Sequence, residues 1–441
     1  MWQDIRPAAG PLRGTVRVPG DKSISHRAVL FSAMAEGPSR LSGVLDSADV
    51  GSTIAAVEAL GARVHLQFAE GGSLEGVVAG WGSVGPSRPV APIDCGNSGT
   101  TARLLMGVLA GWDVQVILTG DESLSTRPMS RVTDPLAEMG ADFVTDDGHL
   151  PVMVTGGSLR PLTYANPVGS AQVKTAILLA GMRASGRTSV SEPARSRDHT
   201  ERLLPVFGVE VGVAEEKHEA WVDGPVVPTA AEVNVPGDLS SAAFHIVAAA
   251  ILPSSDIRIE GVSLNPTRLG FLRVLERMGA NVEIEAEAPD AGEPSGNIVA
   301  KYSSGLVGTL VEAEEIPSLI DEIPILAVAA ASATGYTRFE GAGELRVKES
   351  DRLAAIERAL TTLGVDVSVE EDALEIQGKG SASGPIFESG NLDSLGDHRL
   401  AMAWAVAGLA SESGVSVDRF EAVDVSYPDF FGDLSRMTGL L

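Results

Sequence analysis

The sequence predicts a mixed α/β (α+β) fold: a two-lobed inside-out barrel with six repeats of a small βαβαββ unit, three per lobe, and buried helices. Three observations lead to this prediction: the length of the chain, a duplicated segment, and a helix and strand pattern that recurs along both halves. At 441 residues the chain is too long for one ordinary core, because single cores stop growing near about 250 to 300 residues. We therefore expect two lobes.

Two stretches of the chain are alike, and self-similarity is the mark of a repeat architecture. They read VPGDKSISHRAVLFSAMA from Val18 and VPGDLSSAAFHIVAAAIL from Val235. The chain is therefore duplicated, and we expect the lobe boundaries at these PGD segments. Residues 20–235 would form the first lobe, and residues 1–19 plus 236–441 the second, with a hinge near 19 and 236.

Six segments rich in small apolar residues are expected to be buried helices, because they are apolar nearly all round. They begin near Asp21, Gly96, Val168, Asp238, Ile320 and Gly396. A helix-like run that ends at Gly and leads into a short alternating strand also recurs, at the segments from Glu58, Glu138, Val206, Glu276 and Thr361. Each unit should thus contain a buried helix, a strand, an amphipathic helix that ends at Gly, and closing strands.

Composition excludes several classes of protein. The hydrophobic content of 44% suits packed interiors, and no apolar run reaches the roughly 18 to 20 residues that a membrane span needs. We see no signal peptide, and the single cysteine, Cys95, excludes an internal disulfide and favours a reducing cytoplasm. The net charge of −26 argues against a nucleic-acid partner, so a local cluster of cations would indicate a smaller anion.

The two copies of the PGD segment differ in charge. Lys22 aligns with Leu239 and Arg27 with Phe244, whereas Ser23 aligns with another serine. A helix start offers unpaired N–H groups and a partial positive charge, so Lys22, Ser23 and Arg27 together predict a phosphate or carboxylate site. The alternative is a serine that only caps the helix and an arginine that is a surface charge.

Similar helix starts occur in the other repeats. The motifs are GNSGTTAR with Asn97, Gly99 and Arg103, GSAQVK with Ser170, Gln172 and Lys174, and GDHR with Asp397, His398 and Arg399. Glycine lets an anion approach the backbone, and hydroxyl or amide groups add directed donors. Each motif is weak by itself: Ser170 could be a cap without a ligand, and Lys174 is better explained as a solvated or structural lysine.

Charge also gathers in SLSTRPM around Arg127 and in LRVKESDRL, which contains Lys348, Glu349 and Arg352. If this second segment is helical, Lys348 and Arg352 share a face and Glu349 lies about 100° round from Lys348. Two cations beside a carboxylate suit an anion site that also moves a proton, although a solvated helix start with an internal ion pair is the alternative. Asp321 opens an apolar helix and is either a cap or a base.

Taken in order, these motifs resemble the 5-enolpyruvylshikimate-3-phosphate synthase (3-phosphoshikimate 1-carboxyvinyltransferase) family. The resemblance spans essentially the whole chain. Its motifs are PGDKSISHR, GNSGTTARL, SLSTRPM, GSAQVKTAILLAG, SRDHTERLL, LRVKESDRL, GDHRLAM and SYPDFF. The resemblance implies two lobes of three repeats that close over the substrates, with the shikimate 3-phosphate side in the first lobe and the phosphoenolpyruvate side and catalytic carboxylates in the second.

The implied reaction transfers the enolpyruvyl (carboxyvinyl) group of phosphoenolpyruvate to the 5-hydroxyl of shikimate 3-phosphate, releasing phosphate, in the shikimate pathway to chorismate and aromatic amino acids. No metal or organic cofactor is implied. The implied ligands of shikimate 3-phosphate are Lys22, Ser23, Arg27, Ser170, Ala171, Gln172, Arg197, Asp321 and Lys348. The implied ligands of phosphoenolpyruvate are Lys22, Asn97, Gly99, Arg127, Gln172, Arg352 and Arg399. The implied catalytic residues are Asp321, Glu349, Lys22 and Lys348.

In this family pattern Asp321 is the base and Glu349 gives a proton to carbon. Many members carry a lysine that contacts phosphoenolpyruvate where this chain has Val425, so another cation must compensate or affinity will fall. Members that are insensitive to glyphosate carry alanine in place of Gly99. We therefore expect glyphosate to inhibit this chain.

Three other readings compete. A related UDP-N-acetylglucosamine enolpyruvyl transferase would need a reactive cysteine on a mobile loop near Arg127, whereas Cys95 precedes GNSGTT. A paralogous enolpyruvyl transferase with a different hydroxylated acceptor could keep the same donor site. A non-catalytic repeat scaffold would not place unlike cations at equivalent helix starts. We expect a monomer that acts on small molecules, with no membrane partner.

Overall fold

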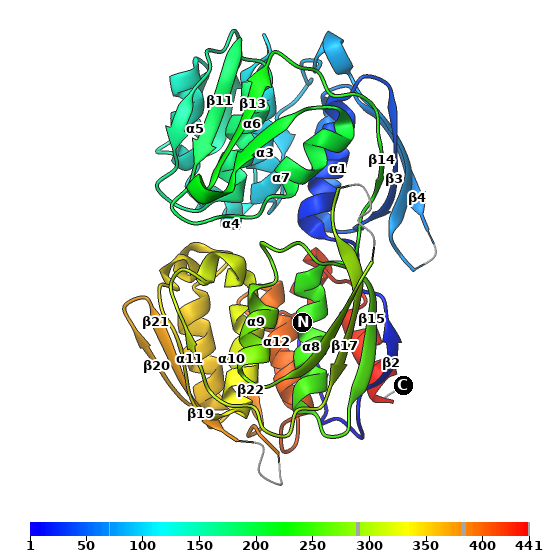
Figure 1. The fold of residues 1–441 in the computed structure, drawn as a ribbon, viewed down its shortest axis with the longest axis vertical. Helices are drawn as coiled ribbons and strands as arrows, with labels where there is room; N and C mark the ends of the chain where they lie inside the picture. The colour runs from blue at the N-terminus through cyan, green and yellow to red at the C-terminus, as the bar shows by residue number, and fades with distance from the viewer. Residues whose placement is uncertain (70, 288–291, 381–384, 440–441) are drawn as a thin grey trace. The chain divides into compact units, whose positions relative to one another are not determined.

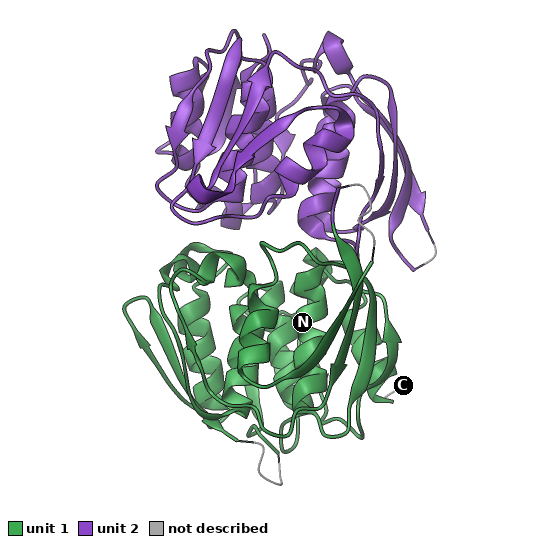
Figure 2. Cartoon of the chain, viewed as in Figure 1, with its two compact units in different colours: residues 1–18, 237–288, 294–441 green, residues 19–236, 289–293 purple. Residues whose placement is uncertain are grey.

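The computed structural model describes residues 1–69, 71–287, 292–380 and 385–439, and the chain divides into two compact units (Figures 1 and 2). Unit 1 comprises Met1–Val18, Gly237–Ala288 and Pro294–Leu441, and unit 2 comprises Pro19–Pro236 and Pro289–Glu293. Each unit has a hydrophobic core of its own.

Unit 2 contains three four-stranded sheets with the strand orders β14-β3-β5-β4, β6-β7-β9-β8 and β10-β11-β13-β12. Its strands are β3 (Pro38–Val44), β4 (Arg63–Phe68), β5 (Leu74–Ala79), β6 (Ile93–Asp94), β7 (Gln115–Thr119), β8 (Asp142–Asp146), β9 (His149–Thr155), β10 (Thr163–Ala165), β11 (Gly186–Ser191), β12 (Val211–Ala214), β13 (Glu219–Gly224) and β14 (Glu232–Asn234). Its α-helices are α1 (Lys22–Met34), α2 (Ala48–Ala59), α3 (Gly99–Ala110), α4 (Glu122–Ser125), α5 (Ser130–Met139), α6 (Ala171–Gly181) and α7 (His199–Leu203). Three short 3-10 helices complete it, η1 (Gly82–Val84), η2 (Leu204–Phe207) and η3 (Glu215–Lys217).

Unit 1 contains two four-stranded sheets, β16-β17-β15-β2 and β18-β19-β21-β20, and one three-stranded sheet, β1-β23-β22. Its strands are β1 (Gln3–Ile5), β2 (Arg13–Val16), β15 (Asp256–Ser263), β16 (Asn281–Ala286), β17 (Ser295–Lys301), β18 (Leu310–Val311), β19 (Thr334–Phe339), β20 (Asp366–Glu370), β21 (Ala373–Lys379), β22 (Gly390–Asp393) and β23 (Val415–Asp418). Its α-helices are α8 (Leu239–Ile251), α9 (Gly270–Arg277), α10 (Ile323–Ser332), α11 (Arg352–Thr362), α12 (His398–Leu409) and α13 (Phe430–Thr438). Its 3-10 helices are η4 (Ile316–Ser318), η5 (Ile320–Glu322), η6 (Gly343–Val347) and η7 (Phe420–Val425).

The predicted mixed α/β class with buried helices is confirmed, with one correction. The described strands form six separate sheets. The sixth repeat lacks a closing hairpin: after β23 the chain continues into η7 and α13, and β1 from the start of the chain completes the sheet. The hairpin pattern that signals the other five repeats is absent from that part of the sequence.

Two strands exchange places at the start of the duplicated segments. β2 precedes α1 in the sequence but pairs in parallel with β15 of unit 1, and β14 precedes α8 but pairs in parallel with β3 of unit 2. The chain therefore leaves unit 1 after β2 and returns to it after β14. In the other described repeats, a short strand, a buried helix and a parallel strand follow one another directly, as in β6, α3 and β7.

The six central helices are buried because their sequences are apolar on every side. Every residue of α8, α10 and α12 is buried, and in unit 1 these three helices pack together between the sheets (Figure 1). In unit 2, α3 packs closely on α6, and α1 is buried from Ile24 onward. Burial of such helices is the main favourable term in folding, since apolar surface removed from water contributes about 25 cal/mol per Å².

The start of α1 depends on a glycine in the PGD motif. A Cβ added at Gly20 would lie 1.9 Å from the carbonyl oxygen of Gly43, so no other residue fits without a backbone shift. Asp21 then caps the helix by accepting a hydrogen bond from the Ile24 amide at 2.9 Å. The glycine and the cap together bring the first turn of α1, with Lys22, to its place in unit 2.

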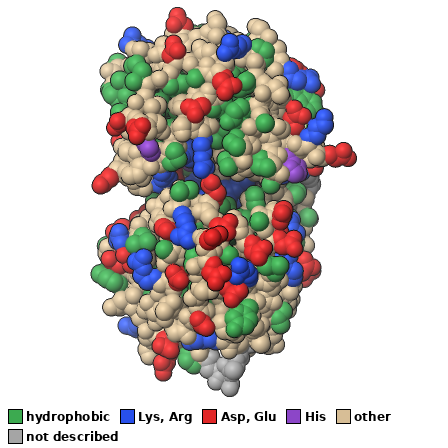
Figure 3. Space-filling view, turned by 90° about the vertical axis from the view of Figure 1, so that its left-hand side faces the viewer, with side chains coloured by type: hydrophobic (Ala, Val, Ile, Leu, Met, Phe, Trp, Pro, Cys, Tyr) green, Lys and Arg blue, Asp and Glu red, His purple; other side chains and the backbone are tan. Residues whose placement is uncertain are grey.

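Acidic and basic side chains are interspersed on the surface of each unit in the space-filling view (Figure 3). The net charge of −26 is therefore not gathered into one block on this face. Among the described residues, no helix combines the length and apolar character needed to cross a membrane.

Candidate functional site

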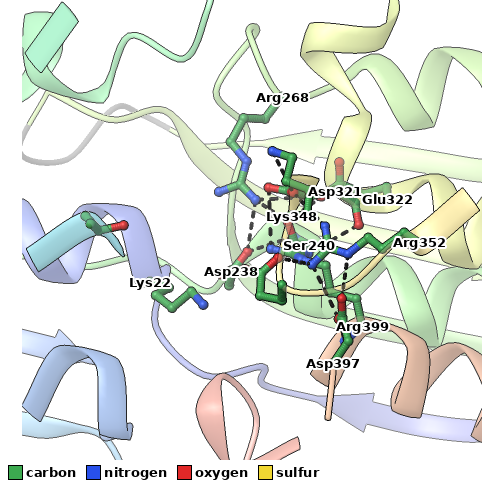
Figure 4. Close-up of polar contacts among 12 residues, drawn as sticks. Lys22, Asp238, Ser240, Arg268, Asp321, Glu322, Lys348, Arg352, Asp397 and Arg399 are labelled. Atoms are coloured by element: carbon green, nitrogen blue, oxygen red, sulfur yellow. Dashed lines mark hydrogen bonds and ion pairs between the residues drawn. The ribbon is translucent and has the colours of Figure 1, made fainter. Parts of the chain in front are cut away.

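Four helix starts converge at one end of unit 1. The Ser240 hydroxyl, in the first turn of α8, donates to Glu322 at the start of α10. Asp321, beside Glu322, lies 3.6 Å from the Arg399 guanidinium in the first turn of α12. Arg352, the first residue of α11, also contacts Asp321. Charged side chains from four different helices are thereby held in one cluster (Figure 4).

Arg352 is the centre of this cluster, and its side chain has no exposed surface. Its Nε donates to Asp397 at 2.7 Å, Nη2 to Glu349 at 2.6 Å and Nη1 to Asp321 at 3.3 Å. Burial opposes the charge on Arg352, but Asp397, Glu349 and Asp321 outweigh burial and raise the pKa of Arg352 above its ordinary value. A planar guanidinium that bridges three carboxylates is a rigid centre on which the others are aligned.

Asp321 is not a helix cap. It lies in η5, the N-cap position of α10 belongs to Glu322, and no side chain caps that helix. The Asp321 carboxylate instead lies 3.3 Å from Arg352, 3.8 Å from the Lys348 ammonium and 3.6 Å from Arg399. Three cations around one carboxylate favour its ionised form, as a base requires.

Lys348 and Arg352 would share a face only if one helix carried both, and the structure has no such helix there. η6 ends at Val347, Lys348 follows it in a non-helical conformation, and α11 begins only at Arg352. The angular relation expected for Glu349 therefore does not apply. The reason is that Asp351 caps α11, accepting from the Ala354 amide at 3.1 Å, so the preceding residues lie outside the helix.

A second buried ion pair adjoins this cluster. Arg268 is 3% exposed and donates to Ser240 and, at 3.2 Å, to Asp238, and it lies 3.8 Å from Glu322 (Figure 4). Buried charges are tolerated when they are paired and hydrogen-bonded. The positive charge of Arg268 thus compensates the negative charge of Glu322, the residue next to Asp321.

In unit 2, the starts of α1, α2, α3 and α6 also lie at one end. The Lys22 ammonium is 3.1 Å from Asp49 in the first turn of α2. The Arg27 guanidinium donates to Thr200 at 2.8 Å, to Thr175 of α6 at 3.0 Å and to the Ser23 carbonyl at 3.0 Å. Arg27 is not a surface charge: burial lowers its pKa to about 10, partly opposed by Glu201, and it stays protonated at neutral pH.

A second group surrounds the start of α3. Arg127 donates to the Asn97 amide oxygen at 2.6 Å, and the Asn97 amide donates to Asp121 at 2.7 Å. Ser98 caps the helix, and a Cβ added at Gly99 would lie 3.6 Å from the guanidinium nitrogens of both Arg103 and Arg127. Free helix N–H groups and two guanidinium groups are a combination that suits an anion.

Gln172 joins α6 to α3 in both directions. Its carbonyl oxygen accepts from Arg103 at 2.6 Å, and its amide donates to Thr100 at 2.9 Å. Ser170 caps α6, Ala171 is the first helical residue, and the Ser170 amide donates to Glu192 at 2.8 Å. Serine thus does cap this helix, as the alternative interpretation expected.

Lys174 is neither solvated nor exposed. Its ammonium is 3.0 Å from Glu192 and 2.7 Å from Glu201, with 4% of the side chain exposed. Burial opposes its charge, but the two glutamates outweigh burial and raise the pKa of Lys174. Lys174 is therefore a structural lysine that holds Glu192, the acceptor for the Ser170 amide.

The predicted site residues fall into two sets. Unit 1 holds a single connected cluster of Asp321, Lys348, Glu349, Arg352 and Arg399. Unit 2 holds Lys22, Ser23, Arg27, Asn97, Gly99, Arg127, Ser170, Ala171, Gln172 and Arg197. Within unit 2, Arg27 contacts Ser23, Arg127 contacts Asn97, and Arg197 lies close enough to Arg27 to lower its pKa.

Sequence reasoning missed three charged residues that complete these clusters. Asp49 and Arg268 carry no motif that would have indicated them. Glu322 could have been found, since it is adjacent to Asp321. The GDHR motif did indicate Asp397, but not its pairing with Arg352.

Cys95 and Val425 occupy positions that bear on the competing interpretations. Cys95 is fully buried, and burial, with a smaller contribution from Asp94, raises the pKa of its thiol to about 12. A thiol in this environment is a poor nucleophile. Val425 is the last residue of η7 and is half-buried. Within the described residues, no group of three or more His, Cys, Asp or Glu side chains could hold a metal ion.

Comparisons with known proteins agree over nearly the full length of the chain. A 3-phosphoshikimate 1-carboxyvinyltransferase from Synechocystis sp. is 48% identical over 435 residues, covering 98% of this chain and 95% of that protein. Another from Rhodospirillum rubrum is 47% identical over 436 residues, with the same coverage of 98% and 95%.

Solved structures give the same result. The structure of EPSP synthase from Acinetobacter baumannii matches with a TM-score of 0.88 and 40% identity, covering 99% of this chain and 98% of that one. The enolpyruvyl transferase NikO from Streptomyces tendae matches with a TM-score of 0.78 at 19% identity, covering 98% of this chain and 96% of that one, which shows a shared fold alone. The sequence profile of EPSP synthase (3-phosphoshikimate 1-carboxyvinyltransferase) matches residues 7–434. The family that the motifs predicted is confirmed, and the chain belongs to the EPSP synthase family.

Proposed function

We propose that this chain transfers the enolpyruvyl group of phosphoenolpyruvate to the 5-hydroxyl of shikimate 3-phosphate, giving 5-enolpyruvylshikimate 3-phosphate and phosphate in the shikimate pathway. The observation that carries the proposal is the Asp321 carboxylate with Lys348, Arg352 and Arg399 within 3.8 Å of it. A base surrounded by cations is what a reaction between two anionic molecules needs, because the cations also neutralise the substrates.

The chemistry divides into addition and elimination. In the addition, Asp321 takes the proton of the 5-hydroxyl, the oxygen attacks the second carbon of phosphoenolpyruvate, and Glu349 gives a proton to the methylene carbon. In the elimination, the carbon–oxygen bond to phosphate breaks and the phosphate leaves with the bonding electrons. The new methyl group returns a proton to Glu349, which forms the enol ether, and the proton held by Asp321 passes to the leaving phosphate. Both carboxyl groups are thereby reset, and the atoms and charges balance.

Glu349 must carry a proton to act as the acid, yet its carboxylate pairs with Arg352 at 2.6 Å. An anionic substrate group that binds Arg352 would compete with Glu349 for the guanidinium. The carboxyl group would then be able to hold a proton, and desolvation would favour its neutral form further. Substrate binding and activation of the acid would in this way be linked.

The proposal assigns substrate ligands to each unit. In unit 2, the ligands of shikimate 3-phosphate are Lys22, Ser23, Arg27, Ser170, Ala171, Gln172 and Arg197, and those of phosphoenolpyruvate are Lys22, Asn97, Gly99, Arg127 and Gln172. In unit 1, Asp321 and Lys348 serve shikimate 3-phosphate, and Arg352 and Arg399 serve phosphoenolpyruvate. The two arginines would supply the contact that other members take from a lysine at the position of Val425. A hinge near 19 and 236, a monomeric state and a cytoplasmic location stay predictions.

The test is phosphate release by the purified protein given shikimate 3-phosphate and phosphoenolpyruvate together, and each alone. Release only with both supports the transferase. Release with phosphoenolpyruvate and another hydroxylated acceptor, but not with shikimate 3-phosphate, would favour the paralogous transferase instead. No release with any pair, although the protein is folded, would contradict the proposal and leave a non-catalytic scaffold.

Residue roles are tested by Asp321→Asn and Glu349→Gln, which keep the shape of each side chain. Since general acid and base groups typically contribute about 10² to 10⁴ in rate, kcat should fall by about that factor in each variant. Glu283→Gln is the matched control, because Glu283 is an exposed strand residue of the same unit. A kcat loss that the control shares would remove the assigned roles.

A further inference from the structure

A continuous chain of buried hydrogen bonds runs through unit 2 from α1 across α2 to the start of α3. His26 Nδ1 is 2.7 Å from the Thr53 hydroxyl, which is 2.6 Å from the Thr101 hydroxyl. The Thr101 hydroxyl donates to the Ser98 hydroxyl at 2.7 Å. All four side chains are at most 2% exposed. Three helices are therefore connected by polar groups inside an otherwise apolar core.

The direction of each hydrogen bond follows from the last one. Because Thr101 gives its hydroxyl proton to Ser98, Thr53 must donate to Thr101, and the imidazole N–H at Nδ1 must donate to Thr53. This leaves Nε2 of His26 unprotonated, and within the described residues it has no hydrogen-bond partner. Burial lowers the pKa of His26 to about 3, so the ring is neutral and the chain keeps one direction at physiological pH.

The fold itself does not require these polar groups. In the duplicated helix α8, Ala243 and Phe244 occupy the positions of His26 and Arg27, and both are buried. At these two positions the corresponding helix of unit 1 is thus packed with apolar side chains, although it buries Ser240, Ser241 and His245 elsewhere. Because burying polar groups costs free energy that apolar residues do not, His26 and Arg27 have a purpose other than packing.

This chain of hydrogen bonds ends at the start of α3, where the proposed function places ligands of phosphoenolpyruvate. Ser98 is the N-cap of that helix, and its hydroxyl accepts from both the amide and the hydroxyl of Thr101. The next residue is Gly99, where the guanidinium groups of Arg103 and Arg127 approach. At the other end, His26 lies one turn from Lys22 on α1. Lys22 is held separately, by its ion pair with Asp49, so the hydrogen-bond chain itself fixes the start of α3 against α1.

A second, separate set of hydroxyls connects α1 to α6 and α7. Arg27 donates to Thr175 and Thr200, whose hydroxyls are 2.6 Å apart. None of these groups hydrogen-bonds to the His26 chain in the structure as described. The helix α1 is thus connected on one side to α3 and on the other to α6, through different residues.

We infer that Thr53 and Thr101 are positioning residues for phosphoenolpyruvate, acting through the start of α3, whereas Thr175 positions Arg27 for shikimate 3-phosphate. This inference rests on the proposed function, because that function assigns Gly99 and Arg127 to one substrate and Arg27 to the other. The inference predicts that each variant raises KM for one substrate and leaves KM for the other nearly unchanged, an outcome that a general loss of stability would not produce.

The experiment measures KM for each substrate in Thr53→Val and Thr175→Val by phosphate release. Valine keeps the shape of threonine but removes the hydroxyl. Thr53→Val should raise KM for phosphoenolpyruvate about threefold to tenfold, the effect of one lost hydrogen bond, with KM for shikimate 3-phosphate nearly unchanged. Thr175→Val should do the reverse. Thr53→Ser, which restores the hydroxyl, should return KM for phosphoenolpyruvate toward the wild-type value.

Thr101→Val tests the same chain from its other end, in case Thr53→Val does not fold. It should again raise KM for phosphoenolpyruvate, and the double variant Thr53→Val/Thr101→Val should be no worse than the stronger single variant, since both break one chain. Equal changes in both KM values, or changes confined to kcat and stability, would overturn the inference. A wild-type protein that releases no phosphate would instead refute the proposed function, so the two failures are distinct.

Discussion

Arg352 donates from Nε to Asp397 at 2.7 Å, and neither side chain has any exposed surface. Asp397 is also the N-cap of α12, where it accepts from the Arg399 amide at 2.9 Å. One carboxylate therefore fixes both the centre of the unit 1 cluster and the first turn of the helix that presents Arg399. This double use explains why an aspartate is buried there in spite of its charge.

Arg352→Lys tests the geometry of this contact rather than its charge. Lysine keeps the positive charge but lacks the planar fork that reaches Asp397, Glu349 and Asp321 at once. We expect the free energy of unfolding to fall by about 2 kcal/mol and kcat/KM to fall about 100-fold, because buried carboxylates lose hydrogen-bond donors. Urea denaturation and phosphate release would measure the two effects.

The control for this variant is Arg358→Lys, on the exposed side of the same helix α11. It should change neither quantity noticeably, since exposed charges contribute little to stability. An Arg352→Lys protein with normal kcat/KM would show that a point charge is enough at this position, and that the bridging geometry is dispensable.

Gly99→Ala tests the expected inhibition by glyphosate. A Cβ at this position would meet Leu124 at 3.5 Å and the guanidinium nitrogens of Arg103 and Arg127 at 3.6 Å, all ordinary contact distances. The variant should therefore fold, and helix stability should be equal or slightly higher, since alanine exceeds glycine by roughly 0.5 to 1 kcal/mol in a helix. The added methyl group would reduce the space beside the two arginines, so the inhibition constant for glyphosate should rise about tenfold or more.

Gly51→Ala is the matched control, because Gly51 lies in helix α2 with no atom within 4 Å of an added Cβ. It should leave inhibition unchanged. Inhibition constants would be measured against phosphoenolpyruvate by phosphate release. A Gly99→Ala protein as sensitive to glyphosate as the wild type would contradict the prediction.

Periodicity and duplication predicted the fold because its buried helices have a distinctive apolar, small-residue composition in the sequence. All six apolar segments are buried helices, and α2, α5, α9 and α11 each lead into a strand at a glycine. The sixth repeat was predicted less well, since β1 comes from the far end of the chain and no local pattern can indicate such a pairing. Closure of a sheet is likewise a property of strand order that local patterns leave open.

The candidate site was predicted as a set of charges but not as a geometry. Lys348 and Arg352 are four residues apart and would share a face if their segment were helical, yet the cap at Asp351 makes α11 begin at Arg352. Asp321 resembled a cap, and only its distances to three cations show another role. The sequence does not indicate the chain of hydrogen bonds through Thr53, because threonine and histidine are common in helices and their hydrogen bonds depend on tertiary packing.

Lys174→Met tests the buried group of charges behind Ser170. The methionine would leave Glu192 and Glu201 close together in the interior without their cation. Removing one partner from such a group costs about 3 to 5 kcal/mol, so the free energy of unfolding should fall by about that amount. Urea denaturation would measure it.

The triple variant Lys174→Met/Glu192→Gln/Glu201→Gln removes all three charges together and should recover part of the lost stability. A single variant as stable as the wild type would show that the two glutamates find other compensation. Equal destabilisation in the single and triple variants would indicate lost packing rather than an unpaired charge.

The pH dependence of stability should report two buried histidines. Burial lowers the pKa of both His26 and His245 from 6.5 to about 3, so between these values the unfolded chain binds protons that the folded chain does not. Stability from this source is fully present above pH 6.5 and is lost as the pH falls from 6.5 toward 3. Each histidine should add a slope of about 1.4 kcal/mol per pH unit in the lower part of this range.

In urea denaturation between pH 7 and 5, His26→Asn and His245→Asn should each show a shallower loss of stability than the wild type. Subtraction of the variant curve from the wild-type curve removes the contribution of the carboxylates, which all three proteins share. A variant curve parallel to that of the wild type would mean that the histidine it replaces gains a proton in the folded protein as readily as in the unfolded chain.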